Sequence, residues 1–316
     1  MQQRRLGRTD LTIAPIVFGG NVFGWTADKA ASFAILDRFL EEGGNAIDTA
    51  DVYSAWAPGN SGGESETILG EWMKARGNRS KVVVITKVGS PMGEGKKGLS
   101  ERYIVQAVEA SLKRLQTDMI DLYLSHWPDP DTPYEETLGA YQRLIEHGKV
   151  RWCGASNLDA AQLKAALAAS EARGLPRYDV LQPEYNLADR GSFEGPLANL
   201  CQSEEIGVIT YFSLAKGFLS GKYRTEADLT KSARGGGVKG YLNPRGFRIL
   251  AALDAVSAKH EAKPAEVALA WIMAKPAVTA PIASATTVEQ TDSLIRAAKL
   301  SLSPEDVKAL DDASAP

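Results

Sequence analysis

The sequence contains few of the residues that build disulfides, metal clusters and membrane spans. It has only two cysteines, Cys153 and Cys201, and three histidines among 316 residues. Two cysteines are too few for a disulfide framework, which is typical of a reducing compartment, and no cysteine–histidine cluster suggests a metal site. No apolar run reaches the length that crosses a bilayer, and the first residues lack the apolar core of a signal peptide. These absences predict a soluble, cytoplasmic protein without a bound metal ion.

Charge and composition exclude further classes of protein. Lysine and arginine total 36 against 39 acidic residues, so the net charge is −3, and no basic block stands out. This balance disfavours nucleic acid or an anionic membrane as the main partner. Hydrophobic residues make up 44% of the chain, which is ordinary for a globular protein with a sizeable core. The length fits one large domain, and we expect a single domain over residues 1–316.

Short apolar runs alternate with amphipathic segments along the chain. The first amphipathic segment carries an apolar stripe of Phe33, Leu36 and Leu40, which predicts a helix. Residues 5–15 read as a hairpin, and residues 216–245, which include Gly235 to Gly237, break the alternation as a long loop that is either functional or mobile. Strands are expected at 16–20, 46–48, 82–87, 120–126, 150–157, 180–186, 207–213 and 278–285. Helices are expected at 28–42, 65–76, from 100, and at 133–147, 159–173, 193–205, 248–261, 264–274 and 288–299.

This alternation predicts a closed parallel barrel. Repeated strand–helix units that return to the same sheet form either a (β/α)8 barrel or an open doubly wound sheet. The open sheet would carry a Gly-x-Gly-x-x-Gly turn after its first strand, and here only Gly19 and Gly20 occupy that place. We therefore predict an α/β protein with the fold of a (β/α)8 TIM barrel, preceded by an amino-terminal β-hairpin.

Four polar side chains lie at or just beyond the ends of three successive predicted strands. Asp48 and Tyr53 follow one strand, Lys87 ends the next, and His126 ends the third. The carboxyl ends of barrel strands are where such enzymes place their chemistry. A phenol titrates near pH 10, a neighbouring ammonium lowers its pKa, and a carboxylate keeps that ammonium charged. Each residue alone could be a cap, a solvated side chain or a packing group, but their joint placement predicts a proton-transfer site.

No residue of this set is a convincing nucleophile. Such a set protonates or deprotonates an oxygen atom while a second event takes place at carbon. A histidine opposite the phenol can orient a carbonyl group or relay the proton. The set thus handles the proton at oxygen, and a hydride donor would complete the reaction at carbon. This reasoning implies a nicotinamide cofactor.

The motifs together resemble the aldo-keto reductase family over essentially the whole chain. The first half carries Leu6–Thr9, Asn45–Tyr53, Thr86–Lys87 and Asp121–Pro128 in the order of that family. The second half carries Gly148–Arg151, Gly154–Asn157, Gln182–Asn186 and Leu214–Tyr223. The chain stops soon after the last predicted helix, as in bacterial members with a short carboxyl-terminal loop, and it is similar to the branch that includes potassium-channel β-subunits.

The resemblance implies a barrel that binds NADP(H) at its carboxyl-terminal face and reduces aldehydes or ketones, or oxidises alcohols. Tyr53 would be the general acid, Lys87 and Asp48 would lower its pKa, and His126 would help to hold the carbonyl group. The cofactor-binding positions implied by the family are Ser156, Asn157 and Gln182 at the nicotinamide carboxamide, Tyr211 stacked on the ring, and Ser213, Leu214, Ala215 and Gly217 along the pyrophosphate.

The resemblance fails after the last predicted strand. Family members often place a glycine, a basic residue near the 2′-phosphate and an asparagine near the adenine there, whereas this chain has Ser284, Thr286 and Ser293; Gln290 fits the pattern. Loss of a charge-assisted bond to the phosphate weakens discrimination for NADP. Basic residues of the long loop, Lys216, Lys222 or Arg224, are candidates to replace it. NADP(H) is the first expectation, and NAD(H) stays an alternative.

Three tryptophans, Trp25, Trp56 and Trp127, follow predicted strands and are candidates for the substrate pocket. As a pocket lining they would favour an apolar or aromatic carbonyl compound; alternatively, they pack the loops. The sequence specifies neither the substrate nor the oligomeric state. A second interpretation is a cofactor-binding regulatory subunit with little turnover, although the chain begins directly at the hairpin, without the amino-terminal segment usual for such subunits. An isomerase or lyase that uses the same acid and base is a third interpretation, and it would need no nicotinamide.

Overall fold

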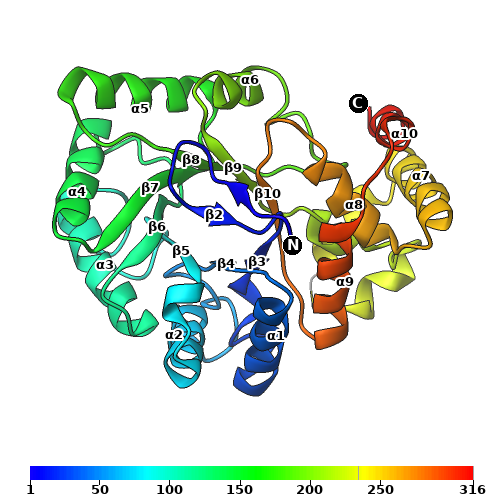
Figure 1. Ribbon diagram of the computed structural model, residues 1–316, viewed down its shortest axis with the longest axis horizontal. Coiled ribbons are helices and arrows are strands. Elements are labelled where there is room, and N and C mark those ends of the chain that lie inside the picture. The colour runs from blue at the N-terminus through cyan, green and yellow to red at the C-terminus, as the bar shows by residue number, and fades with distance from the viewer. Residues whose placement is uncertain (234, 316) are drawn as a thin grey trace.

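The computed structural model describes residues 1–233 and 235–315 and shows a closed barrel of parallel strands (Figure 1). The barrel strands are β3 (Val17–Gly19), β4 (Ala46–Asp48), β5 (Val83–Val88), β6 (Ile120–Ser125), β7 (Val150–Ser156), β8 (Val180–Gln182), β9 (Gly207–Thr210) and β10 (Ala280–Ala283). Their spatial order follows the chain order, and β10 pairs with β3 to close the ring. The predicted (β/α)8 barrel is confirmed.

The register of the strands brings the predicted site residues to one end of the barrel. Asp48 of β4 pairs with Ile85 of β5, and Lys87 of β5 pairs with Leu124 of β6. Because side chains alternate along a strand, one set of residues fills the barrel interior and the other packs against the surrounding helices. The interior set includes Leu6, Leu11, Ile13, Val17, Ala46, Ile85, Leu122, Leu124, Val180, Ile209, Ala280 and Ile282.

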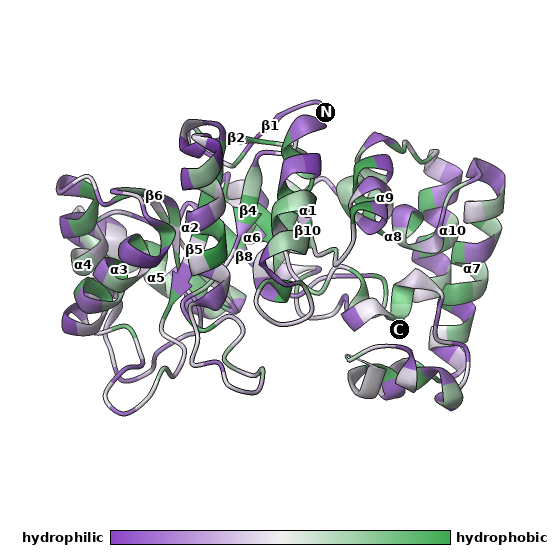
Figure 2. Ribbon diagram, turned by 90° about the horizontal axis from the view of Figure 1, so that it is seen from below, coloured by the Kyte–Doolittle hydropathy of each residue, from purple (hydrophilic) through white to green (hydrophobic). Residues whose placement is uncertain are grey.

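The predicted amino-terminal hairpin is also confirmed. Strands β1 (Arg4–Arg5) and β2 (Thr12–Ile13) pair antiparallel. The side chains of Leu6 and Ile13 are fully buried and belong to the cluster that fills the barrel. Figure 2 shows the hairpin and the amino terminus at one end of the barrel and the long loops at the other. The hairpin therefore plugs the end opposite to the predicted site.

Helices pack around the barrel, and no described helix is long and apolar enough to cross a membrane. The helices around the barrel are α1 (Lys29–Glu41), α2 (Glu64–Arg76), α3 (Glu101–Leu115), α4 (Tyr134–Glu146), α5 (Ala160–Arg173), α6 (Pro196–Ser203), α8 (Pro264–Met273) and α9 (Val288–Lys299). In α1 the buried residues are Ser32, Ile35, Leu36 and Phe39, so the expected stripe through Phe33 and Leu40 was displaced around the helix. The helix was predicted correctly from its spacing of apolar residues, but which side of the helix is buried depends on the strands that it covers.

Two helices lie outside the barrel ring, α7 (Pro244–His260) and α10 (Pro304–Ser314), and they pack against each other (Figure 1). Helix α7 begins four residues before the expected start at 248, because the Asn243 side chain accepts a hydrogen bond from the Gly246 amide at 2.9 Å and Pro244 occupies the first turn. The residues after the last βα unit also form a helix, α10, which was not among the expected helices.

The segment expected as a long loop, 216–245, is a series of short helical turns, the first of which is interrupted by positive φ angles at Lys216 and Gly217. It contains three short 3₁₀ helices, η3 (Ala215–Ser220), η4 (Glu226–Lys231) and η5 (Gly235–Tyr241), and the start of α7. Of the glycines, Gly235 packs so tightly that a Cβ atom there would lie 1.7 Å from the Leu229 carbonyl oxygen. Close packing therefore requires this glycine.

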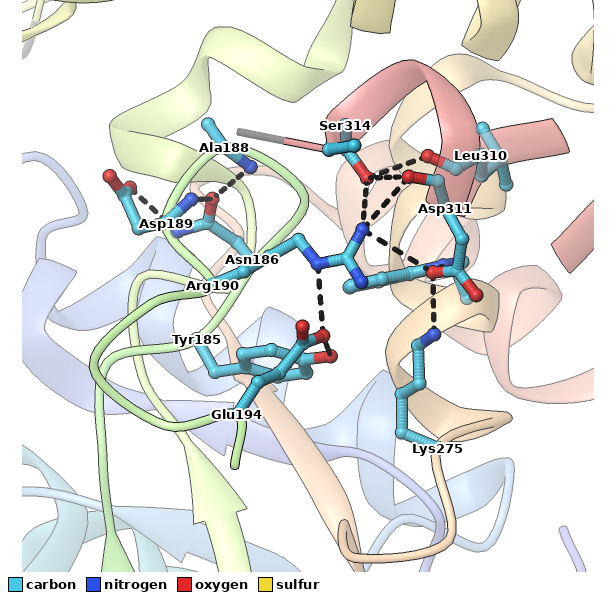
Figure 3. A network of polar contacts seen from close by, with 12 residues as sticks. Tyr185, Asn186, Ala188, Asp189, Arg190, Glu194, Lys275, Leu310, Asp311 and Ser314 are labelled. Carbon is cyan, nitrogen blue, oxygen red and sulfur yellow. Dashed lines mark hydrogen bonds and ion pairs between the residues drawn. The ribbon is translucent and has the colours of Figure 1, made fainter. Parts of the chain in front are cut away.

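A polar network ties α10 to the loop after β8 (Figure 3). The Arg190 guanidinium donates to the Asp311 carbonyl oxygen at 3.0 Å and to Ser314 Oγ at 2.7 Å, while Lys275 donates to the Asp311 carboxylate at 2.6 Å. From the same loop, Asn186 Nδ2 donates to the Phe212 carbonyl oxygen at 3.0 Å. The carboxyl-terminal helix thus supports the segment after β9.

Candidate active site

A buried ion pair and a phenol occupy the carboxyl ends of β4 and β5. Lys87 Nζ lies 2.8 Å from Asp48 Oδ2 and donates to the Tyr53 hydroxyl, also at 2.8 Å. It donates a third hydrogen bond, of 2.7 Å, to the Thr49 carbonyl oxygen, and the Tyr53 hydroxyl donates to Asp48 Oδ2 at 3.1 Å. The structure therefore brings together the acid, the phenol and the ammonium group that the sequence placed at two strand ends.

The environment of Lys87 fixes its ammonium group beneath the phenol. Its side chain is fully buried, and burial lowers the pKa of Lys87 from its usual value, while the Asp48 carboxylate acts in the opposite direction. All three ammonium protons have acceptors, so the buried charge is compensated. The Lys87 nitrogen also lies 4.4 Å from the centre of the Tyr53 ring. A proton leaving Tyr53 would therefore leave its negative charge beside a fixed cation.

His126 follows β6, and its ring centre lies 6.1 Å from that of Tyr53. Loss of hydration lowers the pKa of His126 well below its usual value, and the nearby Lys87 charge lowers it further. The imidazole is therefore neutral at pH 7. Its Nδ1 atom lies 3.0 Å from Ser90 Oγ. Ser90, which the sequence analysis missed, orients this ring.

The residues expected at the nicotinamide carboxamide are linked to the same cluster. Gln182 Nε2 donates to Asp48 Oδ1 at 2.8 Å, so Gln182 orients the carboxylate as well. Asn157, which has a left-handed φ of 62°, donates to the His126 carbonyl oxygen at 2.9 Å and accepts from the Tyr211 hydroxyl at 2.6 Å. Ser156 Oγ is buried and donates to the Gln182 carbonyl oxygen at 2.7 Å. Side chains at and just beyond the carboxyl ends of β7, β8 and β9 thus form one hydrogen-bonded rim.

A cavity of about 820 Å³ opens at this end of the barrel. Its lining includes most of the predicted cofactor residues, namely Ser156, Asn157, Gln182, Tyr211, Ser213, Leu214, Gly217, Lys222, Ser284, Thr286, Gln290 and Ser293. Ala215 was also predicted to contact the cofactor, but its side chain is fully buried and does not line the cavity. The cavity is also lined by residues that sequence reasoning missed, among them Asn21, Glu184, Phe212, Lys263 and Glu289. Glu184 lies within the family motif Gln182–Asn186, whereas nothing in the local sequence distinguished the others from ordinary loop and helix-end residues.

The backbone of the segment after β9 is held in an unusual conformation. Phe212, Ala215 and Lys216 have φ angles of 49°, 48° and 58°, and Gly217 has 102°. Positive φ is costly for residues with a side chain, and clusters of such residues occur at functional sites. A residue with negative φ followed by one in the left-handed region, as at Leu214 (φ −107°) and Ala215, can direct successive amide groups toward an anion. The segment that the family resemblance assigned to a pyrophosphate therefore has a suitable backbone.

The segment after β10 satisfies its own polar groups. The Thr286 amide and hydroxyl both donate to Gln290 Oε1, at 2.8 and 3.1 Å. Ser293 Oγ donates to Glu266 at 2.6 Å, and Ser284 Oγ donates to Asn21 at 2.6 Å. None of these four positions carries a positive charge, which agrees with the departure from the family pattern noted in the sequence.

Exposed aromatic rings border the phenol. Trp56 and Trp127 line the cavity, and their exposed fractions are 48% and 49%. The Trp127 ring stacks on His126 with centroids 5.8 Å apart, and Trp56 meets the Tyr53 ring edge-on at 5.9 Å. Trp25 is not among the cavity-lining residues; it packs edge-on against Trp56 at 5.8 Å and supports it from behind. Large rings exposed around a polar group form a surface suited to a flat apolar ligand.

Comparison with known proteins agrees with this geometry. Residues 15–315 match the aldo/keto reductase family. This chain belongs to the aldo/keto reductase family. One relative is an uncharacterized oxidoreductase, YrpG, of Bacillus subtilis (strain 168), which is 34% identical over 99% of this chain and 95% of its own length.

Two other relatives carry more specific names. Norsolorinic acid reductase of Aspergillus flavus is 32% identical over 95% of this chain and 78% of its own length. A probable voltage-gated potassium channel subunit beta of Oryza sativa subsp. japonica is 33% identical over 92% of this chain and 89% of its own length. By their names, these two relatives are an enzyme and a channel subunit. The aldo/keto reductase family acts on small carbonyl compounds and generally binds NADP(H).

A second carboxyl group, that of Asp51, is buried near Lys87, and the Asp51 amide donates to the Lys87 carbonyl oxygen at 3.3 Å. Asp51 is 2% exposed, and neither of its carboxyl oxygens has a hydrogen-bond partner among the described residues. Burial, together with the nearby Glu66 carboxylate, raises the pKa of Asp51 to about 8. The folded protein therefore keeps a proton that the unfolded chain releases above about pH 4. The contribution of Asp51 to the unfolding free energy therefore falls as pH rises between these two values.

Replacing Asp51 by Asn should remove this dependence, because the amide stays neutral at every pH. We expect Asp51→Asn to gain about 2 kcal/mol or more in unfolding free energy relative to wild type between pH 5.5 and pH 8. Denaturant unfolding at several pH values measures the difference, with the exposed Asp118→Asn as a control that leaves it unchanged. Parallel pH curves for wild type and Asp51→Asn would show that Asp51 is ionised in the folded state.

Proposed function

We propose that the protein is an NADP(H)-dependent oxidoreductase that reduces an aldehyde or ketone to an alcohol, or catalyses the reverse reaction, with Tyr53 as the proton donor. The observation that carries the proposal is the fully buried Lys87 ammonium, which is hydrogen-bonded to both the Tyr53 hydroxyl and the Asp48 carboxylate. A buried lysine ion pair contributes little to stability and is costly to assemble. A site that retains one directly beneath a cavity-lining phenol is suited to proton transfer.

The residues of this chain supply the proton chemistry. Tyr53 would donate a hydrogen bond to the carbonyl oxygen and then transfer its proton to the developing alkoxide, while Lys87 stabilises the phenolate that remains. A bound reduced nicotinamide supplies hydride to the carbonyl carbon. Asp48 would keep Lys87 charged throughout, and Gln182 would hold the carboxylate in place. For alcohol oxidation, the same groups act in reverse.

His126 would orient the substrate by hydrogen bonding. The lowered pKa of His126 keeps its imidazole neutral, so it acts as a dipole and adds no second charge to the site. When Nδ1 accepts from the Ser90 hydroxyl, the other nitrogen, Nε2, carries the proton. An N–H group next to the phenol could then donate to the same carbonyl oxygen.

The cavity fits a dinucleotide. Its lining combines the amide side chains of Asn157 and Gln182, the ring of Tyr211 and the positive-φ residues Phe212, Lys216 and Gly217. Lys216 and Lys222 add positive charge suited to phosphate groups along the same cavity, whereas Arg224 is paired with Asp254 at 2.8 Å. These residues would hold the cofactor, with NADP(H) favoured and NAD(H) as the alternative.

The exposed aromatic rings favour a flat, apolar substrate. Stacking against Trp127 and contact with Trp56 would bury aromatic surface beside the Tyr53 hydroxyl. One relative is named a reductase of norsolorinic acid, and we propose that this chain likewise acts on a carbonyl compound larger than a short aliphatic aldehyde.

We expect the purified protein to oxidise NADPH, and NADH less efficiently, when supplied with a carbonyl compound. The kcat/KM for 2-naphthaldehyde should exceed that for propanal by about tenfold or more, since burying additional apolar surface favours the larger ring. Absorbance at the nicotinamide band measures the turnover. Equal kcat/KM values would contradict the aromatic pocket while leaving the reductase intact.

A regulatory subunit that binds the cofactor with little turnover is the second candidate, because a potassium channel subunit beta is among the relatives. Tight binding of NADPH without consumption, over a panel of carbonyl compounds and alcohols, would favour it over the enzyme. Failure to bind either nucleotide would contradict both functions. The isomerase or lyase interpretation would then regain support, since such an enzyme needs no nicotinamide.

A further inference from the structure

One part of the cavity lies between the first turns of two neighbouring helices, α8 and α9. Lys263, which precedes α8, and Glu289, in the first turn of α9, both line it. The Lys263 ammonium meets the Glu289 carboxylate at 3.1 Å, and the two side chains are 55% and 82% exposed. An ion pair this exposed contributes little net stability, so Lys263 can exchange its partner at small cost.

The buried side chain of Glu266 fixes the spacing between Lys263 and Glu289. Glu266 lies one helical turn after Lys263 and is 3% exposed. Its Oε1 atom accepts from Ser293 Oγ at 2.6 Å and from Arg296 Nε at 3.0 Å, both on α9. Residues three or four apart lie on the same helix face, so locking Glu266 to Ser293 holds Lys263 opposite Glu289. The position of Lys263 is thus set by a buried contact, although its own ammonium is exposed.

The facing segment after β10 offers no cation of its own. Ser284, Thr286 and Gln290 are neutral and hydrogen-bonded within their own surroundings, and Arg296 is committed to Glu266. A phosphate group held between α8 and α9 would therefore depend on a cation from another element. Lys263 is placed to supply it, and Lys222, which follows η3, lines the same cavity.

We propose that Lys263 is the residue by which this protein selects NADP(H) over NAD(H), and that Glu289 competes with the 2′-phosphate for it. The inference rests on the proposed function, because it assumes that a dinucleotide fills the cavity. Binding of the 2′-phosphate would transfer the Lys263 ammonium from a carboxylate to a dianion, which forms a stronger charge-assisted bond. NAD(H), with a hydroxyl group in that position, would leave the Lys263–Glu289 pair intact.

Dissociation constants measured without turnover test this assignment. Quenching of tryptophan fluorescence reports binding, because Trp56 and Trp127 line the cavity. We expect Lys263→Met to raise the Kd for NADP⁺ by about tenfold and to change the Kd for NAD⁺ by less than about twofold. Glu289→Gln should lower the Kd for NADP⁺ by about threefold, since it frees Lys263 and removes a negative charge.

The matched control is Lys299→Met. Lys299 pairs with Glu42 at 2.9 Å and is also 55% exposed, but it lies at the end of α9 and is not among the residues that line the cavity. It should leave both dissociation constants unchanged.

A second comparison uses two fragments of the cofactor, 2′,5′-adenosine diphosphate and 5′-AMP, which differ only by the 2′-phosphate. Lys263→Met should weaken the binding of 2′,5′-adenosine diphosphate and leave the binding of 5′-AMP unchanged.

The outcomes separate the two proposals. If wild type binds NADP⁺ and Lys263→Met binds it equally well, Lys263 is not the selecting residue, and the proposed function still stands. If Lys263→Met weakens NADP⁺ and NAD⁺ equally, Lys263 acts on the shared part of the cofactor and the assignment to the 2′-phosphate is wrong. If wild type binds neither nucleotide, the proposed function fails, and this inference fails with it.

Discussion

Tyr53→Phe should reduce kcat for carbonyl reduction by roughly 10²–10⁴-fold, the usual contribution of a positioned general acid. The substitution removes one oxygen atom and keeps the ring, so the contacts of Tyr53 with Trp56 and with the Lys87 ammonium survive. Lys87 loses one of its three acceptors but keeps Asp48 and the Thr49 carbonyl oxygen. The fold and the cofactor cavity should therefore stay intact.

The measurement is steady-state turnover together with the Kd for NADPH. We expect the Kd to change by less than about threefold while kcat collapses, because the missing group acts on the reacting oxygen. Tyr134→Phe, a partly buried tyrosine at the start of α4, serves as the control and should keep full activity. Retention of kcat within about tenfold in Tyr53→Phe would assign the proton transfer to another group, and His126 would be the next candidate.

Lys87→Met should have the second large effect, on stability as well as on activity. Removal of the ammonium leaves the Asp48 carboxylate buried, at 2% exposure, and among the described residues only the Gln182 amide and the Tyr53 hydroxyl then donate to it. Breaking a buried ion pair from one side costs about 3–5 kcal/mol. Activity should fall together with stability, because no cation remains to stabilise the Tyr53 phenolate.

A double variant separates these two consequences. Combining Lys87→Met with Asp48→Asn removes both charges, so most of the lost unfolding free energy should return while the activity stays lost. Denaturant unfolding and turnover, measured on the two single variants and the double variant, complete the cycle. If Lys87→Met alone were as stable as wild type, the Asp48–Lys87 pair would not be the charged pair that the geometry indicates.

The sequence by itself determined the barrel and the components of its proton-transfer site. All strands of a (β/α)8 barrel run parallel and end at one face, so residues at strand ends, such as Asp48, Lys87 and His126, lie near one another. The hairpin was predictable for a similar reason, because it depends on residues within a few positions of one another. Local patterns were less reliable for phase: the period of α1 was right, whereas its buried face centres on Leu36 and Phe39.

Only the tertiary structure decided which groups support that site. Gln182 contacts Asp48 across 134 positions of sequence, and Ser90 contacts His126 across 36. The Lys263–Glu289 pair depends on the buried Glu266, which locks α8 to α9. No local pattern encodes such partners, because each contact depends on how two separately formed elements pack together. The order of strands and helices therefore determines that the active site lies at the carboxyl ends of the strands. Packing between distant elements determines which partners hold its charged side chains.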